Sequence, residues 1–230
     1  MVKPNNNILH IIVAAGSGSR FGSSLPKQFC ELAGRPVLMT AISRFREYGR
    51  GNIVVVLSEQ MIGFWEDLCR QHSFRSPKVV IGGVSRFDSV KNAIMACGGD
   101  ADIITVHDGA RPLVDTEVID RVITAVEAGA KGVVPAIAVT DSLRMLIGEN
   151  GESESMVRSR FRAVQTPQGF DGDVLREAYS QPYRSDFTDD ASVVESIGRK
   201  IVMVDGSPYN IKITNPADIK VAEAYLQWNV

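Results

Sequence analysis

The stretch that most constrains the fold is Ile11 to Gln28, where a short apolar run meets a glycine-rich loop that carries cations. Its first five residues are apolar, which is typical of a strand buried in a sheet. Gly16 and Gly18 then remove side chains from a turn, so backbone N–H groups can approach a ligand closely. Arg20 and Lys27 add positive charge to the same loop. Bare N–H groups beside fixed cations suit a triphosphate, so the stretch predicts a nucleotide site at a strand end.

Two better-known glycine loops do not match this stretch. A dinucleotide-binding turn needs G-x-G-x-x-G at the start of a helix, but Phe21 stands where the third glycine belongs. Glu59 follows the second expected strand, so a nicotinamide oxidoreductase is disfavoured rather than excluded. A P-loop needs G-K-[ST] at its end, whereas Gly22 is followed by Ser23.

Size and charge narrow the class of protein. A chain of 230 residues can bury a sizeable core, and we expect a single domain over 1–230. The net charge of −2 gives no general attraction to nucleic acid or to an anionic membrane, so we expect neither as a partner. The apolar run near the N-terminus is too short to span a bilayer. Cys30, Cys69 and Cys97 lie far apart without metal-binding spacing, which indicates reduced thiols and a cytoplasmic protein.

Apolar strands alternate with amphipathic helices through the first half of the chain. We expect strands at 11–15, 53–57, 78–81 and 102–106, and helices at 36–48, 61–69, 85–97 and 116–128. The strand runs are continuously apolar, as parallel strands buried on both faces are. The alternation predicts an α/β fold with a doubly wound, mostly parallel sheet.

The pattern changes after Gly132. Residues 133–147 and 155–165 are rich in strand formers and have a turn between them, which predicts a β-arm at about 137–165 inserted into the α/β domain. A two-stranded ribbon is marginal alone, so we expect it to pack on the same arm of a second subunit. After the arm we expect helices at 173–180, 190–197 and from Pro216 onward, and a strand at 200–204.

Ligands of open α/β sheets bind beyond the carboxyl ends of the strands, and polar residues gather there. Asp108 follows one strand and could meet a Mg²⁺ ion on a triphosphate, or it could be a turn aspartate. Arg111 could bind a phosphate or make a surface ion pair. His107 could act as a general base, but a histidine at the end of a buried strand is more often a packed core residue, and we favour that interpretation. Lys212 lies between two isoleucines, so strand alternation directs it towards polar surroundings.

Several motifs occur in order along nearly the whole chain: Ala14-Ala15-Gly16-x-Gly18-x-Arg20, Pro26-Lys27-Gln28, Gly82-Gly83, Arg86-x-Asp88-Ser89-Val90, Asp108-Gly109-Ala110-Arg111-Pro112, Thr166-Pro167-Gln168, Thr188-Asp189-Asp190-Ala191-Ser192 and Asn210-Ile211-Lys212. This set resembles the 2-C-methyl-D-erythritol 4-phosphate cytidylyltransferases of the non-mevalonate isoprenoid pathway. The glycine loop alone would indicate only the wider nucleotidyltransferase superfamily. The resemblance implies a Rossmann-like sheet of the nucleotide-diphospho-sugar transferase type.

The resemblance implies transfer of CMP from CTP to 2-C-methyl-D-erythritol 4-phosphate, with Mg²⁺ and with release of pyrophosphate. It places Asp108 near the metal or the ribose. The other residues that would hold the nucleotide are Ala14, Ala15, Gly16, Gly18, Gly83 and Ser89. The residues that would stabilise charge on the triphosphate are Arg20, Lys27 and Lys212. The residues that would contact the sugar phosphate are Arg111, Ser142, Arg158, Thr166 and Thr188, of which Ser142 and Arg158 lie on the arm and would serve the partner's site in a homodimer.

The chain departs from the family pattern without losing a charge from the expected site. Val13 stands where the family usually has proline, Ser142 stands where threonine is more frequent, and Gly109 replaces a frequent alanine. Two other functions stay open. A ribitol-5-phosphate cytidylyltransferase would share most of these motifs, and a non-catalytic nucleotide-binding regulatory module would share the glycine loop.

Lys27→Ala and Arg20→Ala should each lower kcat by about 10²–10³-fold, because fixed cations oppose the charge that builds up at phosphorus. Pyrophosphate release measures kcat, and circular dichroism checks that each variant is folded. Near-normal turnover of both variants would contradict the assignment.

Overall fold

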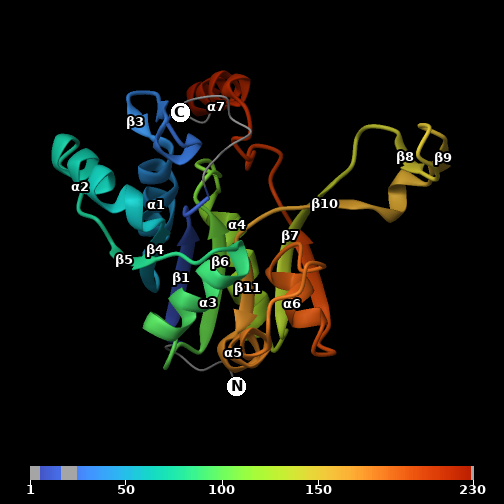
Figure 1. Ribbon diagram of the computed structural model, residues 1–230, viewed down its shortest axis with the longest axis horizontal. Helices are drawn as coiled ribbons and strands as arrows, with labels where there is room; N and C mark the ends of the chain where they lie inside the picture. The colour runs from blue at the N-terminus through green and yellow to red at the C-terminus, as the bar shows by residue number, and fades with distance from the viewer. Residues whose placement is uncertain (1–5, 17–24, 229–230) are drawn as a thin grey trace.

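A mixed eight-stranded sheet forms the centre of the computed structural model, which describes residues 6–16 and 25–228 (Figure 1). The predicted site residues Gly18 and Arg20 lie outside the described residues. The strands follow the order β10-β7-β11-β6-β1-β4-β5, and β12 also pairs with β7. The bounds of these strands are β1 Ile8–Val13, β4 Asn52–Leu57, β5 Lys78–Ile81, β6 Ile103–Asp108, β7 Gly132–Ala138, β10 Arg162–Val164, β11 Gln168–Asp171 and β12 Ile201–Asp205.

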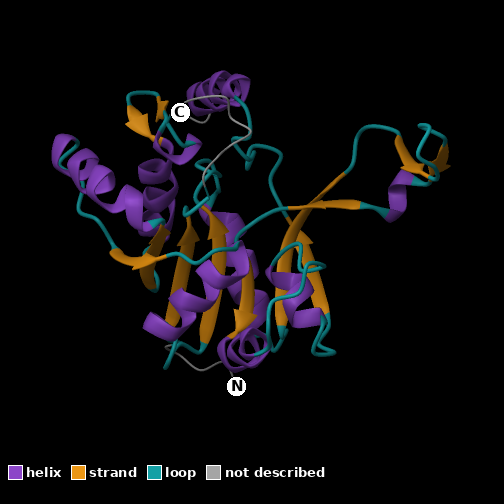
Figure 2. Ribbon diagram, viewed as in Figure 1, coloured by secondary structure: helices purple, strands orange, loops and turns teal. Residues whose placement is uncertain are grey.

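Helices cover both faces of the sheet, which confirms the predicted doubly wound α/β class (Figure 2). The helices α1, α2 and α4 share one apolar cluster with Ile8 and Ile12 of β1, and α3, α5 and α6 share another with Leu9 and Ile11. Successive residues of β1 therefore face opposite helix layers. The helix bounds are α1 Val37–Tyr48, α2 Ile62–Gln71, α3 Arg86–Cys97, α4 Thr116–Glu127, α5 Gly172–Ser180, α6 Asp190–Glu195 and α7 Pro216–Trp228.

The parallel half of the sheet matches the apolar runs of the sequence. β1 lies between β4 and β6 and is parallel to both, and β5 continues the parallel arrangement beside β4. The expected strand at 102–106 extends to Asp108, so His107 and Asp108 are themselves the last residues of β6. Both therefore have their backbone fixed by the sheet rather than by a loop.

The other half of the sheet is less parallel than predicted. β11 runs antiparallel between β6 and β7, in a segment where the sequence analysis expected no strand. Its four residues include Gly169 and the buried Gln168, so they show no apolar alternation. A Cβ on Gly169 would lie 2.4 Å from Cγ1 of Val122, which means that α4 packs directly against the backbone of β11. Close helix packing explains this glycine, and it also hides the strand from pattern analysis.

Two short hairpins complete the description. The chain leaves the sheet after β7, forms a hairpin of β8 (Leu143–Leu146) and β9 (Ser153–Met156), and returns through β10 to pair with β7. This arm projects away from the helices and the sheet (Figures 1 and 2). A small hairpin of β2 (Glu31–Leu32) and β3 (Arg35–Pro36) packs with α7.

Across 6–16 and 25–228, no helix combines the length and the apolar character needed to cross a bilayer.

Candidate functional site

Most of the predicted site residues that the structure describes converge at the carboxyl ends of β1 and β6. Small residues make this convergence possible. A Cβ on Gly82 would lie 2.6 Å from Cβ of Ala15, and one on Gly109 would lie 3.0 Å from Cβ of Ala14. The loops after β5 and β6 thus touch the end of β1, at distances that larger side chains would prevent. This contact explains why two alanines precede the glycine loop.

Lys27 is brought to this place by its neighbour Gln28. The Gln28 side chain is buried, and its amide nitrogen donates to the carbonyl oxygens of Ala14 (2.8 Å) and Gly16 (3.0 Å). Lys27 begins the short helix η2 (Lys27–Phe29), so these bonds hold it beside the start of the glycine loop. The sequence analysis quoted Gln28 only as part of a motif, and the structure shows that it attaches the lysine to β1.

The loop after β5 holds itself in place through Ser89. The N–H of Gly83 donates to Oγ of Ser89 (3.1 Å), and the Ser89 hydroxyl donates to the carbonyl of Ser85 (2.9 Å). Ser85 begins α3 with a capping box, in which Asp88 returns a bond to the backbone N–H of Ser85. The glycines therefore sit on a preorganised turn at a helix N-terminus.

Among the described residues, three cationic side chains surround the Asp108 carboxylate. Nζ of Lys212 lies 2.7 Å from Oδ2, Nη2 of Arg86 lies 3.5 Å from Oδ1, and Nε of Arg111 lies 3.8 Å from Oδ2. Burial alone would raise the pKa of the Asp108 carboxyl, but Arg86, Lys212 and Arg111 outweigh burial and hold the pKa well below its usual range. Asp108 is therefore ionised, and it orients the cations around it.

A metal site made by the protein alone does not fit this arrangement. No cluster of three or more His, Cys, Asp or Glu side chains suited to a metal occurs in the part of the chain that the structure describes. Mg²⁺ prefers several oxygen ligands, whereas Asp108 offers one carboxylate that is already paired with cations.

Arg86 and Asp190, to which the sequence alone assigned no role, form the deepest ion pair of the site. Nη2 of Arg86 lies 2.7 Å from Oδ2 of the fully buried Asp190, and the hydroxyl of Tyr179 donates to Oδ1 at 2.6 Å. Burial alone would lower the pKa of Arg86, but Asp190 and Asp108 raise it above its usual value. Arg86 thus joins Asp108 to the start of α6, next to Thr188. The helical pattern could not reveal a partner 104 residues away.

Thr166, Arg111 and Lys212 are brought together by Asn210. Nδ2 of Asn210 donates to the Thr166 carbonyl (2.9 Å), and Nη1 of Arg111 donates to the Asn210 carbonyl (2.7 Å). Oγ1 of Thr166 in turn accepts from the backbone N–H of Asp108 (3.0 Å). Residues 210–214 are a loop rather than a strand, yet Ile213 is buried and Lys212 is exposed, as alternation predicted.

Arg111 is largely buried in the site. Its side chain is 12% exposed, and its buried Nε has no hydrogen-bond partner among the described residues. Burial lowers the pKa of Arg111, and Asp108 partly opposes this change. An unsatisfied buried donor costs about 1–3 kcal/mol, and here Nε faces Oδ2 of Asp108 at 3.8 Å, which is too long for a hydrogen bond.

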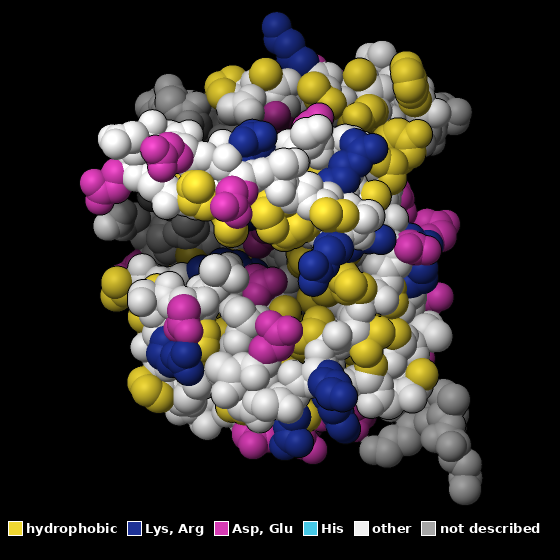
Figure 3. All heavy atoms as spheres, turned by 90° about the vertical axis from the view of Figure 1, so that its right-hand side faces the viewer, with side chains coloured by type: hydrophobic (Ala, Val, Ile, Leu, Met, Phe, Trp, Pro, Cys, Tyr) yellow, Lys and Arg dark blue, Asp and Glu magenta, His cyan; other side chains and the backbone are white. Residues whose placement is uncertain are grey.

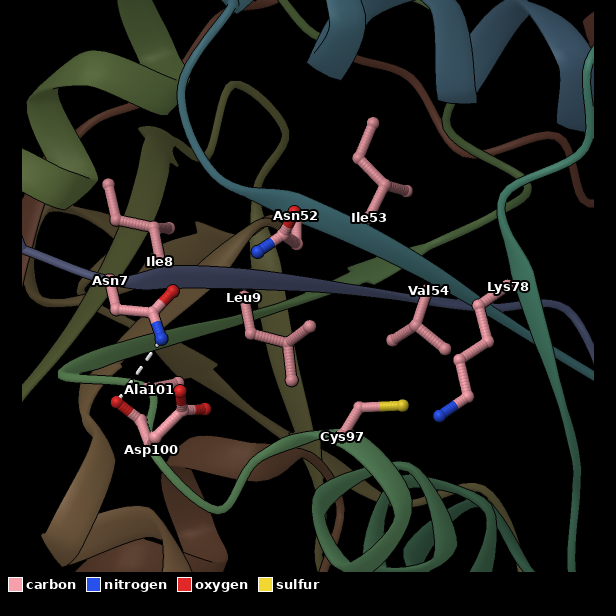
Figure 4. Close-up of a pocket in the computed structure, with 10 residues that line it drawn as sticks. All are labelled: Asn7, Ile8, Leu9, Asn52, Ile53, Val54, Lys78, Cys97, Asp100 and Ala101. Atoms are coloured by element: carbon pink, nitrogen blue, oxygen red, sulfur yellow. Dashed lines mark hydrogen bonds between the residues drawn. The ribbon is translucent and has the colours of Figure 1, made fainter.

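Ser142 and Arg158 do not join this cluster within one chain. Both are exposed on the arm, and the Arg158 guanidinium donates to the carbonyl of Thr140. A separate cavity of about 370 Å³ lies at the opposite end of the sheet, where the first residues of β1, β4 and β5 meet Cys97 and Asp100 (Figure 4). That cavity shares no residue with the site.

The comparisons with known proteins agree with this geometry. A family model for 2-C-methyl-D-erythritol 4-phosphate cytidylyltransferase (IspD) matches residues 8–228. The chain is 44% identical over 218 residues to an enzyme of that name from Bacteroides fragilis, covering 94% of this chain and 98% of the relative. It also resembles the crystal structure of 4-diphosphocytidyl-2C-methyl-D-erythritol synthase from Anaerococcus prevotii, with TM-score 0.79, 27% identity and coverage of 96% and 99%. The cytidylyltransferase structure from Thermus thermophilus gives TM-score 0.73, 28% identity and coverage of 97% and 99%.

The buried histidines predict a pH-dependent stability. Burial lowers the pKa of both His10 and His107 to about 4, so the folded protein keeps them neutral while the unfolded chain protonates them. The free energy of unfolding should therefore fall by about 2 kcal/mol per histidine from about pH 7 to about pH 5. Urea unfolding at both pH values measures this, and His10→Phe should remove about half of the decrease. An unchanged decrease in that variant would contradict the prediction.

Proposed function

The chain belongs to the 2-C-methyl-D-erythritol 4-phosphate cytidylyltransferase family, and we propose that the cations around Asp108 form its reaction centre. The enzyme transfers CMP from CTP to 2-C-methyl-D-erythritol 4-phosphate in the non-mevalonate isoprenoid pathway. An oxygen of the acceptor phosphate attacks the α-phosphorus of CTP, the bond to the β-phosphate breaks, and pyrophosphate leaves. The observation that carries the proposal is the set of three cations held around ionised Asp108 at the carboxyl end of β6.

The acceptor phosphate is already an anionic nucleophile, so the reaction needs no strong base. This agrees with a neutral His107 whose ring nitrogens are both hydrogen-bonded. The obstacle is repulsion between two anions and the charge that develops at phosphorus. We assign Lys27 and Lys212 to the triphosphate, and Arg111, Thr166 and Thr188 to the acceptor. Asp108 holds the Lys212 ammonium in place until the substrates arrive.

We further propose that CTP binds over the loops at the ends of β1 and β5. Ala14, Ala15 and Gly16 supply backbone at close range, and the turn at Gly83 is held by Ser89. Mg²⁺ bound to the triphosphate would neutralise part of its charge, with phosphate oxygens as its main ligands. A contact between Asp108 and this ion stays a prediction.

Pyrophosphate release should be fast only with CTP and 2-C-methyl-D-erythritol 4-phosphate, when CTP, UTP, ATP and GTP are each tested with that acceptor and with ribitol 5-phosphate.

Arg111→Ala should raise the KM for the acceptor about tenfold or more, because a charge-assisted bond is lost. Arg70→Ala, an exposed arginine on α2, is the matched control.

Release with ribitol 5-phosphate would keep the mechanism and change the acceptor. CTP binding without release for any pair would indicate a non-catalytic module and overturn the proposal.

We propose that the arm packs against a second copy of the chain in a homodimer. Met145, Leu146, Val157 and Phe161 are exposed on it, and Leu146 is 74% exposed. Figure 3 shows hydrophobic side chains among charged ones on the side from which the arm projects. Such residues on a thin ribbon favour burial against a partner. The arm at about 137–165 would then be the dimerisation element of a single domain over 1–230.

A cytoplasmic location also stays a prediction.

Mixed dimers test whether the arm serves the partner's site. A dimer of one Arg158→Ala chain and one Lys27→Ala chain should recover about half of the wild-type activity, because one site then has both residues. Each variant alone should be nearly inactive. Purified heterodimers carrying two different affinity tags allow the measurement. If the heterodimer is as inactive as its parents, Arg158 acts within its own chain.

A further inference from the structure

His107 makes a pair of hydrogen bonds that can be assigned without ambiguity. Its Nε2 lies 3.0 Å from the Arg111 carbonyl, which can only accept, so Nε2 carries the proton. Its Nδ1 lies 3.1 Å from Oγ1 of Thr166 and is therefore the acceptor, so the Thr166 hydroxyl donates to it. The same oxygen accepts from the N–H of Asp108 (3.0 Å). One neutral imidazole thus fixes Thr166 on one side and Arg111 on the other.

The hydrogen bond from His107 to the Arg111 carbonyl holds the turn that follows β6 against the end of that strand. The N–H of Arg111 donates to the Asp108 carbonyl (2.9 Å), and its own carbonyl accepts from His107. The backbone of Arg111 is thus held from both sides, so its guanidinium leaves the turn in one direction, beside Asp108. Thr166 follows a different strand, β10. Among the described residues, its side chain is joined to β6 only by its hydrogen bonds with His107 and with the backbone N–H of Asp108.

We propose that His107 is a positioning residue for the acceptor substrate, acting through the Arg111 backbone and the Thr166 hydroxyl. Because that hydroxyl donates its only proton to His107 and accepts from Asp108, its remaining lone pair can accept from a hydroxyl of the acceptor. It touches neither substrate, because its side chain is fully buried. The proposal rests on the acceptor roles proposed above for Arg111 and Thr166. A displacement of about 1 Å in such groups can lower a rate by about 10²-fold.

The chain contains its own control, because His10 has a similar environment away from the site. His10 is also fully buried, its Nδ1 lies 2.8 Å from the Thr105 hydroxyl, and its Nε2 lies 2.8 Å from the Arg50 carbonyl. Both imidazoles lie with ring centroids 4.9 Å from Phe45. Arg50 precedes β4, so the His10 bonds lie towards the amino end of the sheet.

The test compares His107→Phe with His10→Phe, each of which keeps a ring and loses both bonds. His107→Phe should lower kcat/KM for 2-C-methyl-D-erythritol 4-phosphate by about 10- to 100-fold. Its KM for CTP should stay within about twofold, because the nucleotide loops are held by Gln28 and Ser89. His10→Phe should lose similar thermal stability and keep all its kinetic constants within about twofold.

Two partial variants identify which bond matters, and they carry the test if His107→Phe does not fold. His107→Asn can accept from Thr166 but cannot reach Arg111, and His107→Gln can donate to the Arg111 carbonyl. Each should recover part of the kcat/KM for the acceptor. Adding Thr166→Val should have a smaller effect in His107→Phe than in the wild type, since the two act together.

Normal acceptor kinetics in every His107 variant would overturn the inference and leave a purely structural histidine. If Arg111→Ala and Thr166→Val also leave the acceptor KM unchanged, the proposed acceptor roles themselves fail. If those two variants are impaired and the His107 variants are not, only the inference fails.

Discussion

The ion pairs of the largely buried Asp108 carboxylate are the interactions on which the site depends. Lys212, Arg86 and Arg111 come from different parts of the chain, and their charges would repel one another without an anion between them. Asp190 supplies a second anion behind Arg86. The carboxylates thus hold the cations together without substrate, and phosphate groups bound at the proposed site would meet a preorganised positive field.

Close packing of small residues makes this electrostatic arrangement possible. Ala14 and Ala15 follow β1 with almost no side chain, and Gly82 and Gly109 face them from the neighbouring loops. The loop after β6 therefore lies near the loop after β5. Buried amides then join further segments to this point, since Gln28 attaches η2 and Asn210 attaches the residues before α7. Buried polar side chains thus hold in place the loops that carry the proposed site residues.

Local patterns predicted the parallel half of the fold well. Continuous apolar runs marked β4 and β5, because strands buried on both faces have no polar side to alternate with. β11 escaped prediction, because Gly169 serves the packing of α4 and Gln168 serves a hydrogen bond to Asp189. Lys212 was expected to point to polar surroundings as part of a strand, and it does so from a loop, because Ile213 on its other side is buried.

The sequence by itself determined the α/β class and the family to which the chain belongs. These depend on periodicity and on short motifs, which neighbouring residues encode. The tertiary structure alone decided that Arg86 pairs with Asp190, that Gln28 places Lys27, and which nitrogen of His107 carries the proton. Those outcomes depend on which distant loops meet at one edge of the sheet, and residues far apart in the sequence carry no periodic signal of their partners.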